Sequence, residues 1–312
     1  MALGISGLKV GTFTDLTNHT GCTVLLPPPG TVGAVAVRGG APGTRESAVL
    51  GPQATNPYCH AVLLTGSSLF GLRAADGVVD WCEERGIGLA LPMGCFPIVG
   101  AAVVLDIRNP EMQKLTAESG RAACNAAVEA DPEEGSVGVG TGCTVGKEAG
   151  SQWACKGGQG VAVASDGAVQ VGAIMGVNAL GSVFAENGQV LAGCRAPASI
   201  PRYPGISADS HSITSMENTV IGCIATNAKL DKAGAYRVAD LAHSGIVRAV
   251  RPAHTSMDGD AIFALATGEV SASVDLVAEL AAEAVATAIR RAVCHATAMP
   301  GFPVDPRATA IS

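Results

Sequence analysis

The chain has 312 residues, of which 48% are hydrophobic and only 15% are charged, which is enough apolar material for a large buried core. Its formal net charge of -7 at pH 7 argues against a surface that binds nucleic acids or anionic membranes, because such binding needs a basic face. The first residues lack the pattern of a signal peptide, and the longest uncharged apolar run, CFPIVGAAVVL, is too short to span a bilayer. We therefore expect a cytoplasmic protein whose partner is a small molecule or peptide, with no nucleic acid and no membrane.

The cysteines are scattered, with no C-x2-4-C pair, so neither a zinc site nor a disulfide framework is predicted. We expect most of them to be buried reduced thiols. The ten are Cys22, Cys59, Cys82, Cys95, Cys124, Cys143, Cys155, Cys194, Cys223 and Cys294. The six histidines share no i, i+4 metal spacing, so we predict surface, core or loop positions for them and no metal or other cofactor.

The first half of the chain contains apolar segments of strand length and two capped helical segments. One helix is expected from about Ser68 to Arg85, ended by Gly86, and a second is expected to open at Asn109-Pro110-Glu111, where Asn can cap and Pro fits the first helical position. The strands predicted here are Leu8–Phe13, Thr23–Leu26, Gly33–Val37 and Ala101–Leu105.

The second half repeats this alternation around a proline-containing loop from about Ala196 to Asn218. A third helix is expected to begin after Asp231 and to end at Arg251-Pro252, and a long Ala-rich fourth helix from about Val274 to Thr297. The strands predicted here are Gly160–Ala164, Val169–Met175, Val220–Thr226 and Ala261–Ala266.

Mixed strands and helices indicate an α/β or α+β layered fold. No linker, fixed-period repeat or low-complexity tail divides the chain, so one domain is the simpler prediction. Glycine occurs 40 times, close to twice its usual share of ~7%, while aromatic residues make up only 4%. We therefore expect layers packed from small side chains with close backbone approach.

The glycine-rich segment GSVGVGTGCTVGKE, residues 135–148, does not match a phosphate-binding loop. Thr141 stands where the first glycine belongs, and Glu148 follows Lys147 where a Ser or Thr should bind magnesium. The segment is either a flexible turn-rich loop or a place where backbone amides and Lys147 approach a small ligand.

Asn178 lies in the otherwise apolar stretch VGAIMGVNALGSV. One interpretation is a turn residue between two strands. The other is a side-chain amide that donates to a developing oxyanion.

Asn218 and Thr219 stand where the hydrophilic segment HSITSMEN meets the apolar run TVIGCIAT. Thr219 is therefore predicted to be the first residue of a buried strand. A threonine hydroxyl needs a base, and an N-terminal threonine supplies its own α-amine. Such an amine arises here if the hydroxyl attacks the Asn218 carbonyl, the peptide becomes an ester, and water releases it.

Asp258 and Asp260 precede an apolar strand in HTSMDGDAIFALATG. In extended geometry, residues two apart point to the same side. The pair either forms a turn or orients an amine or hydroxyl and tunes its pKa.

Several stretches together resemble the self-processing aminopeptidase and amidase family typified by DmpA, which also includes nylon-oligomer hydrolase. They span nearly the whole chain and are RGGAPGTRES, HAVLLTGSSLFGLRAADGVVDW, VGVGTGCTVGK, VGAIMGVNALGSV, ENTVIGCIATNA and RPAHTSMDGDAIFALATG.

The resemblance implies a four-layer αββα sandwich, with a connectivity shared with ornithine acetyltransferase, and self-cleavage into residues 1–218 and 219–312. It implies Thr219 as nucleophile, Lys147 and Asn178 near the oxyanion, and Asp258 with Asp260 beside the new amino terminus. It also implies a homo-oligomer, tetramer or larger, of cleaved heterodimers.

The function implied is an N-terminal-nucleophile amide hydrolase acting on small peptides or amide oligomers. DmpA itself has a serine nucleophile, whereas Thr219, Lys147 and the D-G-D pattern resemble the nylon-hydrolase branch. Hydrolysis of 6-aminohexanoate oligomers is therefore one alternative. An acyltransferase of the ornithine acetyltransferase type and a non-catalytic binding protein are the others.

Overall fold

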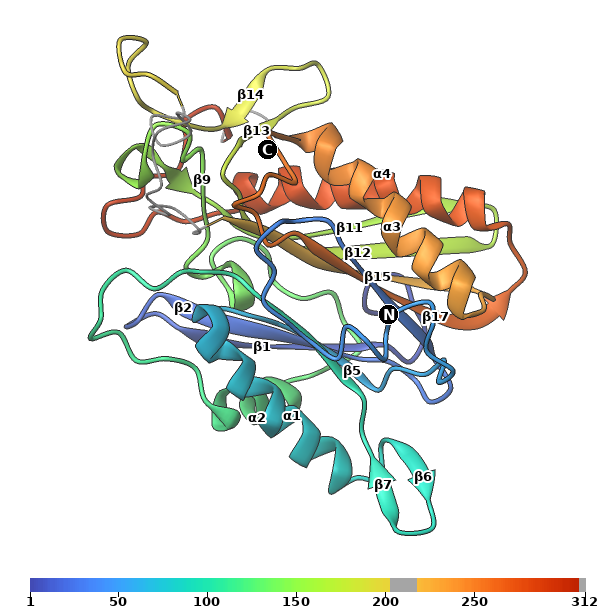
Figure 1. Cartoon of the computed structure of the whole chain (residues 1–312). Helices are drawn as coiled ribbons and strands as arrows, with labels where there is room; N and C mark the ends of the chain where they lie inside the picture. The colour runs from blue at the N-terminus through green and yellow to red at the C-terminus, as the bar shows by residue number, and fades with distance from the viewer. Residues whose placement is uncertain (203–217, 309–312) are drawn as a thin grey trace.

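Two five-stranded sheets lie face to face in the computed structural model, which describes residues 1–202 and 218–308 (Figure 1). The first sheet has the order β1-β2-β5-β8-β4, with β1 at Lys9–Asp15, β2 at Thr20–Leu26, β5 at Ala61–Thr65, β8 at Val99–Val103 and β4 at Thr44–Arg45. The second has the order β11-β12-β15-β17-β3, with β11 at Gly158–Asp166, β12 at Val169–Asn178, β15 at Thr219–Ala228, β17 at Ala261–Val270 and β3 at Val32–Val37.

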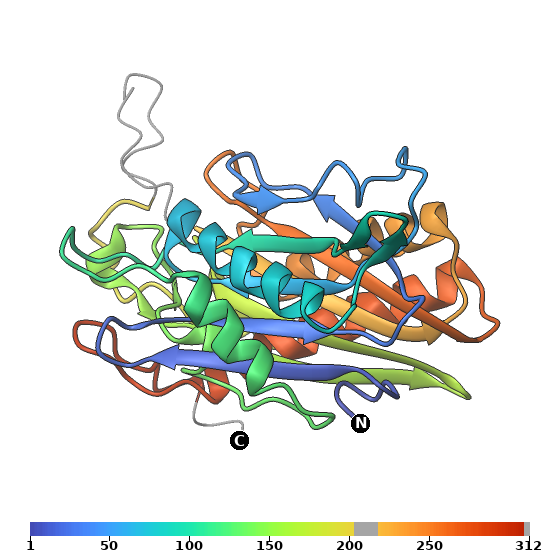
Figure 2. The ribbon, with the colours of Figure 1, turned by 90° about the horizontal axis from the view of Figure 1, so that it is seen from below.

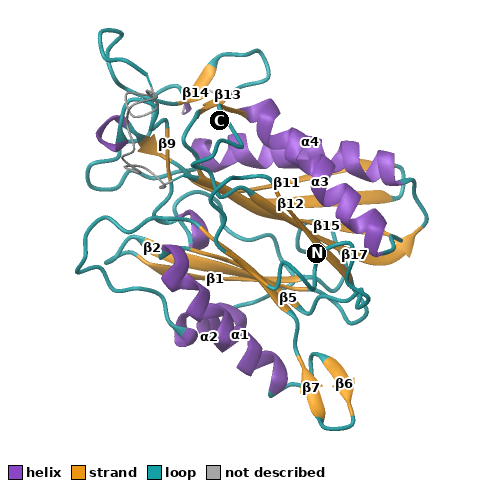
Figure 3. Ribbon diagram, viewed as in Figure 1, coloured by secondary structure: helices purple, strands orange, loops and turns teal. Residues whose placement is uncertain are grey.

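Each sheet is covered on its outer face by two α-helices (Figure 3). Helices α1 (Ala74–Glu83) and α2 (Ala117–Asn125) lie over the first sheet, as Figure 2 shows, and α3 (Lys232–Ala249) and α4 (Val274–Cys294) lie over the second. Three apolar clusters fill the spaces between these four layers. The predicted αββα sandwich is confirmed.

Shorter elements connect the layers. The strands are β6 (Leu89–Leu91), β7 (Gly94–Phe96), β9 (Thr144–Val145), β10 (Cys155–Lys156), β13 (Ser182–Phe184), β14 (Val190–Ala192) and β16 (Val250–Arg251). The 3-10 helices are η1 (Ser68–Arg73), η2 (Gly138–Gly140) and η3 (Ser151–Trp153). None of the helices in the described ranges is long and apolar enough to cross a membrane.

The predicted close packing is visible where α4 crosses β11. A Cβ atom built on Gly160 would lie 1.9 Å from the carbonyl oxygen of Ala288, so only glycine fits at this contact. Along α4 itself, alanines supply much of the buried face. Small side chains therefore let the helix approach the sheet closely, as the composition indicates.

The prediction of a helix opening at Asn109 is wrong. The Asn109 side-chain oxygen accepts from the amides of Glu111 and Met112 in a turn, and α2 begins only after Thr116, which forms a capping box with Ser119. The Asn-Pro-Glu signal is shared by helix caps and by Asx turns, since both satisfy amides two or three residues ahead. The third and fourth helices begin as predicted, after the caps Asp231 and Ser273.

All ten cysteines lie in the described ranges, and none of them forms a disulfide. Seven are buried, so the prediction of buried reduced thiols is confirmed for most of them. Burial raises the pKa of several, for example that of Cys143 to about 12, which keeps these thiols protonated and unreactive.

Candidate active site

Three strand ends of the second sheet meet at one edge. Strand β17 runs parallel to β15, so both begin at this edge, whereas β12 is antiparallel to β15 and ends there. In the β12–β15 register, Asn178 stands directly opposite Thr219. The topology therefore gathers Asn178, Thr219 and the loop that precedes β17, although the sequence separates them widely.

Thr219 begins the buried strand, as the sequence predicts, and 5% of the residue is exposed. Its hydroxyl donates a hydrogen bond to the carbonyl oxygen of Asn218. Residue Asn218 is also buried, with 1% of its surface exposed. The main-chain amide of Gly259 donates to the same oxygen at 3.0 Å. The hydroxyl thus lies against the peptide bond that joins residues 218 and 219.

Lys147 and Asn178 form a buried pair beside Thr219. The Nζ atom of Lys147 lies 3.0 Å from both the carbonyl oxygen and Oδ1 of Asn178. The amide of Thr144 also donates to Oδ1, at 2.9 Å, and Nδ2 of Asn178 donates to the carbonyl of Leu105. The turn interpretation of Asn178 is wrong, since the residue closes strand β12 inside the protein.

Asp258 accepts two hydrogen bonds on Oδ2 from Thr255, at 2.7 Å from its amide and 2.6 Å from its hydroxyl. Burial raises the pKa of Asp258 above its ordinary value, and the negative charge of Asp260 adds to the rise. The Thr255 bonds and the positive charge of Lys147 act in the opposite direction. Lys147 and Asp258 are therefore electrostatic neighbours across the start of β15.

Asp260 fixes the first residues of β15. Its Oδ1 accepts from the amide of Val220 at 2.7 Å, and its Oδ2 accepts from the amide of His254 at 3.0 Å. Asp258 and Asp260 are each 2% exposed or less, so both carboxyl groups are held inside the protein by hydrogen bonds to the chain.

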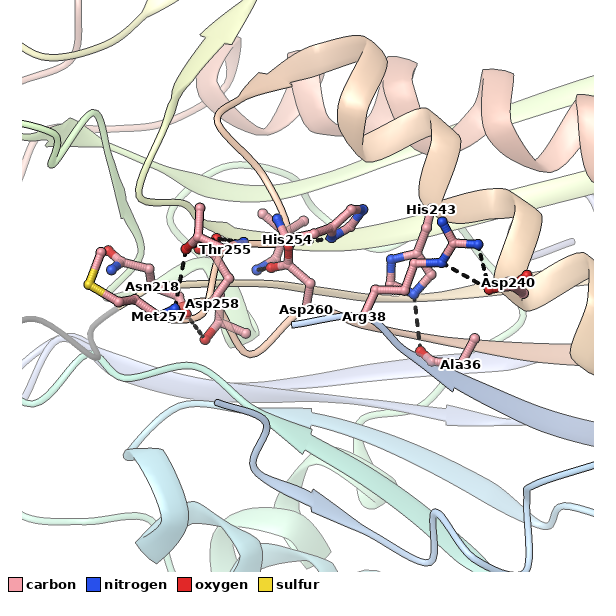
Figure 4. Close-up of polar contacts among 12 residues, drawn as sticks. Ala36, Arg38, Asn218, Asp240, His243, His254, Thr255, Met257, Asp258 and Asp260 are labelled. Atoms are coloured by element: carbon pink, nitrogen blue, oxygen red, sulfur yellow. Dashed lines mark hydrogen bonds and ion pairs between the residues drawn. The ribbon is translucent and has the colours of Figure 1, made fainter. Parts of the chain in front are cut away.

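The segment RGGA, residues 38–41, forms backbone hydrogen bonds to the loop that contains Asp258 and Asp260. The amides of Arg38 and Gly39 donate to the carbonyl of Asp260, and the amide of Ala41 donates to the carbonyl of Asp258. Arg38 also forms an ion pair with Asp240 of α3 (Figure 4). This glycine-containing stretch, to which the sequence alone assigns no role, therefore positions the acidic pair.

His254 belongs to the site, and sequence reasoning missed it. Its Nδ1 atom lies 2.8 Å from Oδ2 of Asp260, and its ring meets that of His243 edge to face with centroids 4.9 Å apart (Figure 4). Burial lowers the pKa of His243 to about 4, so this neighbour is neutral at pH 7. In the sequence, the histidines were tested only for metal-ligand spacing, which cannot detect a histidine that pairs with a carboxylate. The signal that could have found His254 is its position in AHTSMDGD, six residues before Asp260.

The structure thus brings together all the residues predicted for the site: Asn218, Thr219, Lys147, Asn178, Asp258 and Asp260. Residues 203–217 of the predicted loop before Asn218 lie outside the described residues. Within the described ranges, no three His, Cys, Asp or Glu side chains gather in a way that would hold a metal ion.

The αββα sandwich thus places a buried threonine at the start of a core strand, with a Lys–Asn pair and two carboxylates around it. The chain belongs to peptidase family S58, whose model matches residues 3–305. It is accordingly a hydrolase of peptide or amide bonds.

The curated relatives agree with this class. An uncharacterized aminopeptidase of Mycobacterium tuberculosis is 39% identical over 334 residues, covering 96% of this chain and 95% of the relative. A 6-aminohexanoate-oligomer endohydrolase of Paenarthrobacter ureafaciens is 29% identical over 272 residues, covering 85% and 74%.

Solved structures share the fold. The PH0078 protein of Pyrococcus horikoshii superposes with a TM-score of 0.74 at 22% identity, covering 99% of this chain and 91% of that one. The L-aminopeptidase D-Ala-esterase/amidase of Ochrobactrum anthropi superposes with a TM-score of 0.71 at 19% identity, covering 98% and 90%.

Proposed function

We propose that the chain cleaves its own Asn218–Thr219 bond and that the freed Thr219 is then the nucleophile that hydrolyses amides of small peptides or amide oligomers. The observation that carries this proposal is the contact of the Thr219 hydroxyl with the Asn218 carbonyl oxygen in a buried site. A hydroxyl held against the carbonyl of its own peptide bond is positioned for attack on that carbonyl.

In self-cleavage, the Thr219 oxygen bonds to the Asn218 carbonyl carbon and the bond from that carbon to the Thr219 nitrogen breaks. The hydroxyl proton ends on the departing nitrogen, so an ester and an α-amine result. Water then hydrolyses the ester, leaving Asn218 with a carboxyl group and Thr219 with its hydroxyl. The products are residues 1–218 and 219–312, still organised as one domain.

In turnover, the new α-amine accepts the proton of the Thr219 hydroxyl, because a free α-amine has a pKa of about 7.7–8.0. The hydroxyl oxygen attacks the substrate carbonyl, the amine product leaves with that proton, and water releases the acyl group. Lys147 and Asn178, next to Thr219, stabilise the oxyanion. Asp258 and Asp260 hold the amino group and favour its protonated form.

The names of the relatives support one of two amide substrates: a peptide with a free amino terminus, or an oligomer whose units are joined by amide bonds. Aminopeptidase is the printed name of the 39% identical relative, and 6-aminohexanoate oligomers are named for the 29% identical one. Transfer of the acyl group to an amine is the remaining alternative. Product analysis with and without an added amine acceptor separates hydrolysis from transfer.

Two further expectations from the sequence are kept as proposals. One is a homo-oligomer, tetramer or larger, of cleaved heterodimers, and the other is a cytoplasmic location. Native mass spectrometry of the purified protein tests the first, and cell fractionation tests the second.

The deciding experiment is the intact mass of the purified protein, followed by N-terminal sequencing of the smaller fragment. We expect two fragments, the smaller beginning with threonine, and a single inactive chain for Thr219→Ala. Thr219→Ser keeps a hydroxyl and is expected to cleave more slowly, since the lost methyl group relaxes the rotamer that aims the oxygen. A Thr219→Ala protein that remains active as one chain contradicts the proposal.

A further inference from the structure

We propose that the main-chain N–H of Gly259 is the donor that stabilises the oxyanion formed on Asn218 during self-cleavage. This inference rests on the self-cleavage proposed above and adds to it a second oxyanion site. Maturation would use the Gly259 amide, whereas turnover would use Lys147 and Asn178.

The Gly259 amide already contacts the atom that becomes charged. Its nitrogen lies 3.0 Å from the Asn218 carbonyl oxygen, which also accepts from the Thr219 hydroxyl. Asn218 and Asp258 form an isolated parallel bridge in the register of β15 and β17, three residues before the first pair of those strands, Ile221 with Ala261. The nucleophile and the donor therefore meet at the same carbonyl group.

Attack by the Thr219 oxygen converts this carbonyl oxygen into an oxyanion. An N–H group already aimed at the oxygen stabilises the charge as it develops, without reorganisation, and the effect is larger in a buried site. Asn218 is 1% exposed, so water cannot readily replace the donor. The negative charge then collapses as the bond to the Thr219 nitrogen breaks and that nitrogen takes the hydroxyl proton.

Hydrogen bonds from the RGGA segment hold the Gly259 amide in position. The carbonyls on either side of Gly259 both accept bonds from the RGGA segment, Asp258 from the amide of Ala41 at 2.8 Å and Asp260 from the amide of Gly39 at 3.2 Å. Both aspartate side chains are fixed as well, by Thr255 and by Val220. The amide between them is thus preorganised rather than part of a free loop.

The glycine itself is required by close approach. A Cβ atom built at position 259 would lie 3.0 Å from the Thr219 hydroxyl oxygen and 2.9 Å from the carbonyl oxygen of Ala41. Any side chain would press either on the nucleophile or on the segment that holds the loop. Glycine between the two aspartates therefore serves the donor geometry.

The decisive test removes the N–H and leaves the rest of the chain unchanged. Full-length protein is made by in vitro translation with glycolic acid in place of Gly259, which turns that amide into an ester, and incorporation is verified by cleavage of the ester in mild base. We expect self-cleavage, followed by intact mass over time, to slow by on the order of 10²–10³.

A matched ester at position 40 is the control. The Gly40 amide donates to the carbonyl of Thr255 at 3.2 Å, so this ester also weakens the contact between the two loops but leaves the Asn218 carbonyl untouched. Its self-cleavage is expected to stay close to that of the wild-type protein. Thermal unfolding of both ester proteins, each made with Thr219→Ala so that neither is cut, shows whether the fold is retained.

A second variant tests the steric argument. Gly259→Ala keeps the N–H but places a methyl group against the Thr219 oxygen, so slower self-cleavage is expected. Gly51→Ala is the control, because a Cβ atom there lies 3.2 Å from the Ala48 carbonyl, a comparable contact away from the site.

The outcomes separate this inference from the proposed function. If the wild-type chain cleaves and the position-259 ester cleaves equally fast, the Gly259 donor is wrong while self-cleavage stands. If the wild-type chain never cleaves, both are wrong. Slow cleavage of the position-259 ester, with normal cleavage of the position-40 ester, supports the inference.

Discussion

At the scale of single residues, each part of the site is defined by the contacts of its polar atoms. Lys147 and Asn178 contact each other, the two aspartates contact the backbone around them, and the Thr219 hydroxyl contacts the preceding carbonyl. Family resemblance found these residues because each has a distinctive side chain in a matched stretch. Gly259 was not identified as a site residue from the sequence, because its contribution is a backbone amide, which every residue but proline carries.

Lys147 and Asn178 are expected to affect turnover more than folding. Lys147→Ala or Asn178→Ala removes a group beside the substrate oxyanion, so kcat should fall by on the order of 10²–10³ in protein that has folded and cleaved. Steady-state kinetics per titrated active site measures this. Lys229→Ala changes an exposed lysine and serves as the control. Near-normal kcat in both site variants would show that the oxyanion site is elsewhere.

The acidic pair is expected to set the pH dependence of the rate. A nearby negative charge favours the ammonium form of the Thr219 amine, so Asp258→Asn should lower the pKa of that amine. If the free amine is the base, the acidic limb of the kcat/KM profile moves to lower pH in matured Asp258→Asn protein. An unmoved limb would mean that Asp258 does not act on the amine.

Asp258 is also expected to make the uncut chain less stable as pH rises. Burial raises its pKa in the folded chain, so between the unfolded and folded pKa values the folded chain binds more protons and stability falls with pH. In Thr219→Ala protein, adding Asp258→Asn should make that fall smaller and preserve the Thr255 contact through the amide oxygen. Urea denaturation at a series of pH values, from acid to neutral, compares the two chains.

At the scale of elements, local sequence signals predicted most of the second sheet. Its long strands are β-branched or apolar and are bounded by polar turns, and Asp231 and Ser273 are unambiguous helix caps. Strand β5, AVLLT, was not predicted, because an apolar run of only five residues without alternation is a weak strand signal. The second helix was misplaced because an Asx turn uses the same residues as a cap.

The corrected position of α2 is testable through its cap. Thr116→Ala removes the capping box, so the free energy of unfolding of the uncut Thr219→Ala chain should fall by about 0.5–2 kcal/mol. Asn109→Ala, in a turn outside the helix, leaves that box intact and is the matched control. A larger loss for Asn109→Ala than for Thr116→Ala would favour a helix that opens at Asn109.

At the scale of the whole molecule, the pairing of the strands is the feature that the sequence could not show. Strands β15 and β17 are parallel neighbours joined through α3, and β3, from the start of the chain, pairs with β17. Such non-local pairing depends on the packing of all four layers and not on any local pattern. The resemblance to a known family supplied the four-layer architecture in advance, but not these pairings.

This pairing determines how the molecule would respond to a cut at Asn218. Residues 219–312 would contribute β15 and β17 to the centre of the second sheet, between β12 and β3, which both belong to residues 1–218. The two helices of the smaller fragment also pack on that sheet. Separating the fragments would therefore break both of these strand interfaces, together with the β13–β16 pairing, and expose a large apolar surface.

We accordingly expect the cleaved fragments to co-elute from a size-exclusion column and to part only under denaturing conditions. Thr219→Ala, a single chain with the same strand order, should elute at the same volume and act as the control. The test is size-exclusion chromatography followed by denaturing gel electrophoresis of the peak, repeated in guanidinium chloride. Elution of the smaller fragment as a separate folded species in native buffer would contradict the interleaved sheet. Co-elution that persists until the denaturant unfolds the sheet is the result that the strand order requires.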